Sequence, residues 1–323
     1  MSCFGAAVAC VVASSAICAP PPAPHVDMAY DIIARVIISG TPPPPDSFAV
    51  DADRIAKLPP YQFHSGPTAP GMATGLLTGL ISAIPGVGSL LAAGASMAAG
   101  QAFNAAQKHA QEQNAAEARA LMSAGRMTQI AYYRGWRRVT AGQYATITKP
   151  DQGLTIVLDS SKRTYMSQRV DPDIPTYTVD ATPAPLADLV GTPVLAALAP
   201  TTIERQRVRG YHLNGVLHST QAVGWCKAGS HEVDIVEYVA DLPDPDNAPA
   251  KAPDPASVLA SACQPSTTAS AFEPGKLVMY RSFSMRPSIA GDITIVAELG
   301  NIRTTSERDA ALFSPPSDFT EEH

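Results

Sequence analysis

Residues 127–167 read MTQIAYYRGWRRVTAGQYATITKPDQGLTIVLDSSKRTYMS, and this stretch decides the fold class. Short runs of β-branched and aromatic residues alternate with turn signals, of which Arg134-Gly135 and Pro150-Asp151-Gln152-Gly153 are the clearest. The predicted strands are 127–133, 136–140, 143–149, 154–159 and 163–167. Because strands joined by tight turns pair with their neighbours in the chain, this stretch predicts an antiparallel meander.

Strand patterns continue on both sides of the meander. Further strands are expected at 28–39, 203–211, 215–224, 231–239, 276–285 and 292–305. A turn is expected between His212 and His218, and a short helix that begins at Asp254-Pro255 and ends near Cys263. The sequence therefore predicts a protein made mainly of β-strands with few helices.

Four proline-rich or apolar stretches receive a different interpretation. The 30 prolines of the chain cluster between the expected strands, as in linkers. Residues 41–69 are expected to form a loop without regular structure, and the proline-rich loop 241–256 to connect two ordered parts. The short apolar pieces 186–190 and 194–198 are interpreted as helical turns.

Residues 58–107 contain no charged side chain, and Gly71, Gly75 and Gly79 recur there at every fourth position. On a helix this spacing forms a smooth stripe that allows close approach of a second backbone. Pro85-Gly86 breaks the run, so 70–126 is predicted to be an inserted helical hairpin. The candidate ligand-binding or lid residues of this hairpin are Gly71, Gly75, Gly79, Leu80, Ile84, Leu90, Leu91 and Met97.

Three arrangements of the predicted hairpin stay open. Its helices can pack inside the protein as core, cover a ligand cavity as a lid, or enter a membrane and assemble with copies of themselves. Each apolar half is shorter than the ~20 residues that span a bilayer, so a re-entrant hairpin fits better than a complete span.

Residues 1–19 (MSCFGAAVACVVASSAICA) are uncharged, small and apolar, and are followed by prolines. This pattern predicts a signal peptide cleaved after Ala19, although no lysine or arginine precedes the apolar run. Cleavage leaves Cys226 and Cys263 as the cysteines of the mature chain. In an oxidising compartment these two are expected to form a disulfide, the alternative being two unpaired thiols.

An aromatic and basic cluster lies in the first hairpin of the meander: Tyr132, Tyr133, Arg134, Trp136, Arg137 and Arg138. Such side chains can bind an anionic headgroup at a membrane interface, and the candidate residues are Tyr133, Arg134, Trp136 and Arg137. Their alternation equally suits a hairpin with aromatic residues packed inward and arginines in solvent.

Composition and motifs narrow the function classes. A formal net charge of −6 provides no attraction for a phosphate backbone, so nucleic acid is not an expected partner. The chain contains no nucleophile elbow, and its glycine-rich segment lacks the lysine of a phosphate loop. His212, His218 and His231 lack zinc-site spacing, so neither a metal nor a cofactor is expected.

Three patterns in fixed order resemble the periplasmic lipoprotein-carrier (LolA/LolB-like) superfamily. They are YRGWRRVT at 133–140 with IVLDSSKRTYM at 156–166, GYHLNG at 210–215 and LFSPPSDF at 312–319. The resemblance covers 28–39 and 123–320, and the hairpin at 70–126 departs from the family pattern. It implies an α+β fold, a strongly curved antiparallel sheet shaped as a half-barrel, with short helices covering a site for acyl chains. The family has no catalytic residues.

These observations predict a single domain, 20–323, in a periplasmic or secreted protein that is not an enzyme. Its expected role is to bind a hydrophobic small molecule, lipid or lipoprotein, as a carrier or chaperone. The alternative is a membrane-active or self-assembling protein that acts through the glycine zipper at 71–103.

Overall fold

The structure, a computed structural model, describes most of the chain outside the glycine-rich region. The described residues are 25–38, 40–58, 123–169, 187–222, 226–246, 254–260, 263, 270, 272–288 and 291–322. The predicted signal peptide and residues 70–122 of the predicted hairpin lie outside them.

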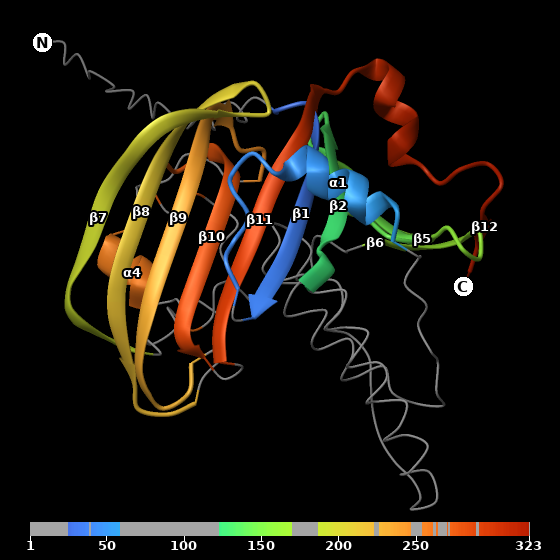
Figure 1. The fold of residues 1–323 in the computed structure, drawn as a ribbon. Helices are drawn as coiled ribbons and strands as arrows, with labels where there is room; N and C mark the ends of the chain where they lie inside the picture. The colour runs from blue at the N-terminus through green and yellow to red at the C-terminus, as the bar shows by residue number, and fades with distance from the viewer. Residues whose placement is uncertain are drawn as a thin grey trace, which may run out of the picture.

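Twelve strands form one open sheet that is not closed into a barrel (Figure 1). Their order is β12-β6-β5-β4-β3-β2-β1-β11-β10-β9-β8-β7, and all neighbours are antiparallel except β12 and β6. The strands are β1 (Met28–Ile38), β2 (Arg126–Tyr133), β3 (Trp136–Ala141), β4 (Tyr144–Lys149), β5 (Leu154–Asp159), β6 (Thr164–Arg169), β7 (Asp188–Ile203), β8 (Gln206–Ser219), β9 (Gly229–Pro243), β10 (Lys276–Ser288), β11 (Gly291–Thr304) and β12 (Thr320–Glu321). The helices are α1 (Phe48–Ala56), α4 (Pro255–Ala260) and the 3-10 helices η1 (Pro150–Gln152) and η2 (Glu307–Phe313).

The predicted meander is confirmed as β2–β6. Arg134 and Gly135 both have positive φ, at 53° and 80°, which matches the twist of the hairpin between β2 and β3. The helix expected at Asp254-Pro255 is α4. The strands expected from 276 and from 292 are β10 and β11.

Three expectations about local structure are wrong. Residues 41–69 are not wholly irregular, because no proline occurs between Pro45 and Pro59 and this proline-free run forms α1. Residues 188–190 and 194–198, from the two apolar pieces 186–190 and 194–198, belong to strand β7 and are not helical turns. No turn separates His212 from His218, since β8 runs unbroken through both.

Strand β7 lies at one edge of the described sheet (Figure 1). The sequence does not predict it, because it contains two prolines and proline is unfavourable in most strands. Pro193 and Pro200 fall inside the two irregular steps of its pairing with β8, between Val190 and Val194 and between Leu198 and Thr201. A proline is tolerated at such bulges and on an edge strand. The turn predicted within β8 is wrong for another reason. Gly215 does not turn the chain; its lack of a side chain leaves room for Leu259 of α4, which lies against it.

The register assigns every side chain to one of two faces. The α4 face carries Leu213, Ile235 and Phe283, together with α4. The α1 face carries Ile33, Arg35 and Glu298, together with α1 and η2. Figure 1 shows α1 and α4 on opposite sides of the sheet.

Helix α1 is held on the α1 face by a close contact and a buried ion network. The backbone of Gly300 in β11 lies directly beneath the ring of Phe48, which is 2% exposed. Arg35 of β1 forms ion pairs with Asp51 of α1 and Glu298 of β11, and all three side chains are at least 90% buried. Burial alone would raise the pKa of Asp51, but the hydrogen bond and charge of Arg35 lower it.

At the other end of the sheet, the C-terminal segment covers the α1 face of the meander. Phe313 of η2 is fully buried against Tyr133 and Trp136, at ring-centroid distances of 6.1 and 6.2 Å. Arg138 donates a hydrogen bond of 2.5 Å to the carbonyl of Leu312. Of the tail that the sequence singled out at 312–319, Phe313 is thus part of the core, and Leu312 and Phe319 pack against it partly buried.

The contact between Gly300 and Phe48 predicts a large effect for a single methyl group. We expect Gly300→Ala to lower the free energy of unfolding by about 1–3 kcal/mol, since the new Cβ would overlap several atoms of a buried ring. Gly215→Ala is the matched control, because its Cβ meets chiefly one terminal methyl group of Leu259, which can rotate away. Urea unfolding of both variants measures the difference, and equal losses would contradict the close packing of α1.

The ion network predicts that removing one partner is costly. We expect Arg35→Met to lower the free energy of unfolding by about 3–5 kcal/mol, because Glu298 is left buried without its guanidinium. Lys57→Met is the control: Lys57 pairs with Asp53 across 2.6 Å, both are mostly exposed, and the expected loss is below about 1 kcal/mol. Denaturant titrations that give the two variants similar losses would contradict the prediction.

Candidate functional site

The most distinctive feature of the described sheet is an apolar strip on the α4 face, buried along most of its length and exposed at Leu195 and Ile38. Its main row crosses six neighbouring strands from β7 to β1, with each residue paired in register to the next. This row consists of Leu195, Leu213, Ile235, Phe283, Ile295 and Val36. A second row beside it crosses five strands and consists of Gly215, Val233, Met285, Ile293 and Ile38. Neither row contains a polar side chain.

The opposite face of the same strands is polar. Asn214, Asp234, Ser284 and Thr294 are register partners there, and Ser284 and Thr294 are hydrogen-bonded to each other across 2.8 Å. His212 and Asn214 contact the Asp234 carboxylate at 2.8 and 3.0 Å. These contacts lower the pKa of Asp234, although burial alone would raise it. In β8–β11 at the level of the strip, the strand alternation thus places apolar side chains on the α4 face and polar ones on the α1 face.

A disulfide holds the cover of the apolar strip in place. Cys226, in the connection from β8 to β9, is bonded to Cys263, which follows α4, and both are fully buried. The sulfur of Cys226 lies 3.7 Å from that of Met285 in the second row. Leu259 of α4 packs in the same hydrophobic cluster. The predicted disulfide is present, and it fixes α4 to the strip.

A polar boundary limits the strip along the strands. Glu237 of β9, which is fully buried, accepts a hydrogen bond of 2.7 Å from Arg281 of β10 and one of 3.0 Å from Ser270. Beside them the ring of Tyr211 stacks on Phe272 at 5.2 Å between centroids. The strip therefore has apolar side chains across its width and fixed charges at one border.

A second polar group lies on the α4 face at β1–β3. Arg137 of β3 donates to the hydroxyl of Tyr132 in β2 at 3.2 Å and lies 3.3 Å from the carboxylate of Asp246, in the loop after β9. Tyr30 of β1 and Tyr132 are 6.2 Å apart between ring centroids. Burial raises the pKa of both tyrosines, and the charge of Asp246 adds to this effect, so both phenols keep their protons.

The structure divides the predicted headgroup residues between the two faces. Tyr133 and Trp136 pack on the α1 face against Phe313, and Arg134 lies above the ring of Tyr133 at 5.1 Å in the exposed turn. Arg137 alone points to the α4 face, where it is 18% exposed. The four residues do not form one headgroup site. The predicted set of Gly71, Gly75, Gly79, Leu80, Ile84, Leu90, Leu91 and Met97 lies outside the described residues.

The three histidines that the sequence analysis considered each contact different partners. His212 contacts Asp234, His218 contacts Ser230, and His231 contacts the carbonyl oxygens of Lys227 and Pro287. Within the described ranges, no group of three His, Cys, Asp or Glu side chains is arranged to hold a metal ion.

Sequence reasoning missed the apolar strip and its border at Glu237 and Arg281. The alternation in VDIVEYV at 233–239 was the available signal, because Val233 and Ile235 share one face and Glu237 follows on the same face. The strand order, which places Phe283 and Ile295 beside them, is not encoded in any local pattern.

No protein-family model matches this chain, and no curated protein matches it in sequence. The resemblance to the lipoprotein-carrier superfamily therefore stays a prediction. None of the helices in the described part of the chain is both long and apolar enough to cross a membrane.

The disulfide predicts a redox-dependent stability. Its cysteines are 37 residues apart, so reduction is expected to lower the free energy of unfolding by about 3–4 kcal/mol. The reason is that the unfolded chain gains conformational entropy when the cross-link is removed. Urea unfolding with and without reductant measures this loss. The Cys226→Ala, Cys263→Ala double variant should no longer respond to reductant, and an unchanged midpoint for the reduced wild type would contradict the prediction.

Proposed function

We propose that this protein is a non-catalytic envelope protein that binds a hydrophobic ligand, such as a lipid, an acyl chain or a lipoprotein, as a carrier or chaperone. The observation that carries the proposal is the apolar row across six strands on the α4 face. Six strands span roughly 24 Å at about 4.8 Å per strand. An acyl chain lying across them would bury its surface at a gain of about 25 cal/mol per Å².

Two further features support the proposal. Open, curved antiparallel sheets hold acyl chains in the lipoprotein-carrier superfamily that the sequence resembles, and the sheet described here is open and curved (Figure 1). Location in the envelope is supported by the apolar residues 1–19 and by the disulfide, which forms in an oxidising compartment.

The first test is native mass spectrometry of the protein purified from its own host. We expect a monomer that carries acyl species, as a carrier would. Detergent-dependent oligomers without bound amphiphile would overturn the carrier proposal in favour of self-assembly through residues 71–103.

The second test uses the two exposed ends of the strip. Leu195 and Ile38 are 46% and 51% exposed, so lysine at either position is compatible with folding. We expect Leu195→Lys and Ile38→Lys to weaken binding of oleyl alcohol at least about tenfold, because a ligand on the strip must desolvate the new ammonium group. Val194→Lys is the matched control, since Val194 is 63% exposed on the α1 face.

Displacement of the neutral dye Nile red by oleyl alcohol measures these affinities. Equal affinities for all three variants would place the ligand away from the strip. A wild-type protein that binds neither the dye nor the alcohol would contradict the proposed function.

A further inference from the structure

Arg137 differs from Arg35 and Arg281, two other arginines of low exposure, in which element supplies the carboxylate that it faces. Arg35 and Arg281 each pair with a glutamate of a neighbouring strand, Glu298 and Glu237, so the sheet itself fixes these two pairs. The carboxylate that faces Arg137 belongs to Asp246, three residues past the end of β9 in a loop. A loop can move away without breaking strand pairing, so the Arg137 contact is the displaceable one.

The surroundings of Arg137 fit an anion better than a second cation. The guanidinium has the hydroxyl of Tyr132 at 3.2 Å, and Tyr30 lies beside Tyr132 on the same face. Arginine presents several N–H donors in a planar fork that matches carboxylate and phosphate oxygens. Protonated phenols beside it add further O–H groups.

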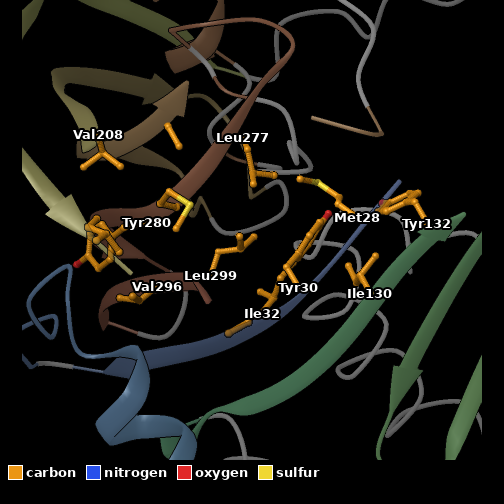
Figure 2. Packing of buried hydrophobic residues seen from close by; sticks show 14 of the residues in the cluster. Met28, Tyr30, Ile32, Ile130, Tyr132, Val208, Leu277, Tyr280, Val296 and Leu299 are labelled. Atoms are coloured by element: carbon orange, nitrogen blue, oxygen red, sulfur yellow. The ribbon is translucent and has the colours of Figure 1, made fainter. Parts of the chain in front are cut away.

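Apolar side chains surround this polar group. Met28, Tyr30, Ile130, Tyr132, Val139 and Leu277 belong to one hydrophobic cluster, most of which Figure 2 shows. Leu242, at the end of β9 and four residues before Asp246, packs against the same cluster. If the segment that carries Asp246 moves away, its ion pair with Arg137 breaks beside this apolar cluster.

We propose that Arg137, with Tyr30 and Tyr132, is a binding site for the anionic headgroup of an amphiphile, a carboxylate or a phosphate monoester, which displaces the carboxylate of Asp246. The alkyl chain of the ligand then extends along β1 from Tyr30 toward the apolar strip at Val36, on the same α4 face. This inference rests on the proposed function, because it names the chemical class of the hydrophobic ligand.

The test compares amphiphiles with the same alkyl chain and different headgroups: oleate, oleoyl lysophosphatidate and neutral oleyl alcohol. Affinities are measured by Nile red displacement on the full chain. We expect Arg137→Gln to weaken binding of the anion about 10- to 100-fold, the range of a charge-assisted hydrogen bond, and to leave oleyl alcohol unchanged. Asp246→Asn should bind the anion about 3- to 10-fold more tightly, since its competitor is neutral.

Arg138→Gln is the matched control, because Arg138 is the next residue but lies on the α1 face, where it bonds Leu312. It should change no affinity. Far-ultraviolet circular dichroism reports whether each variant folds. If Arg137→Gln does not fold, the affinity of Asp246→Asn for the anion still decides the test.

The outcomes separate this inference from the proposed function. Selective loss of oleate binding in Arg137→Gln identifies a carboxylate ligand, and selective loss of lysophosphatidate binding identifies a phosphate. If all variants bind anionic and neutral amphiphiles equally well, the proposed anion site is wrong, and the proposed function as a carrier of hydrophobic ligands is unaffected. If no amphiphile binds, both proposals fail.

Discussion

The pairing of β1 with β11 is the constraint on which the rest of the structure depends. It joins residues 28–38 to residues 291–304 and is the seam between two groups of strands, β2–β6 with β12 on one side and β7–β10 on the other. Without it the chain would form two separate sheets. The buried Arg35 lies across this seam, bonded to Glu298 of β11 and Asp51 of α1, so its ion pairs lock the register of the two strands. A slip by one residue would send every side chain of β1 to the other face.

Register across the seam also explains how one sheet acquires two different faces. The apolar row that ends at Val36 and the polar cluster at Tyr30 and Tyr132 share the α4 face, because Val36 and Tyr30 are an even number of residues apart on β1. The same strand therefore contributes to both proposed ligand contacts, with the apolar strip toward its C-terminal end and the anion site toward its N-terminal end. An amphiphile has the same two-part chemistry, an apolar chain and a charged head.

Local sequence patterns were sufficient for the meander and insufficient for the site. Turn signals such as Arg134-Gly135 act between adjacent residues, so β2 and β3 could be predicted from the chain alone. The disulfide followed from the two cysteines left after the apolar N-terminus. The site could not be predicted, because it joins residues from strands whose neighbours are set by long-range pairing. The alternation in the first hairpin indicated that Tyr133 and Arg137 behave differently, but it did not show that Arg137 is the partly buried arginine that faces a loop carboxylate.

The edge strand β7 has a consequence for the behaviour of the protein in concentrated solution. From Leu189 to Ile203 it contains no charged side chain, and Val194 and Leu195 are largely exposed. A long, uncharged edge of this kind normally invites sheet-to-sheet aggregation. The irregular steps at Pro193 and Pro200 interrupt the edge, and the regular run between them is only Val194–Leu198. A second sheet can therefore match this edge over one short segment, and the two prolines act against growth of the sheet into a fibril.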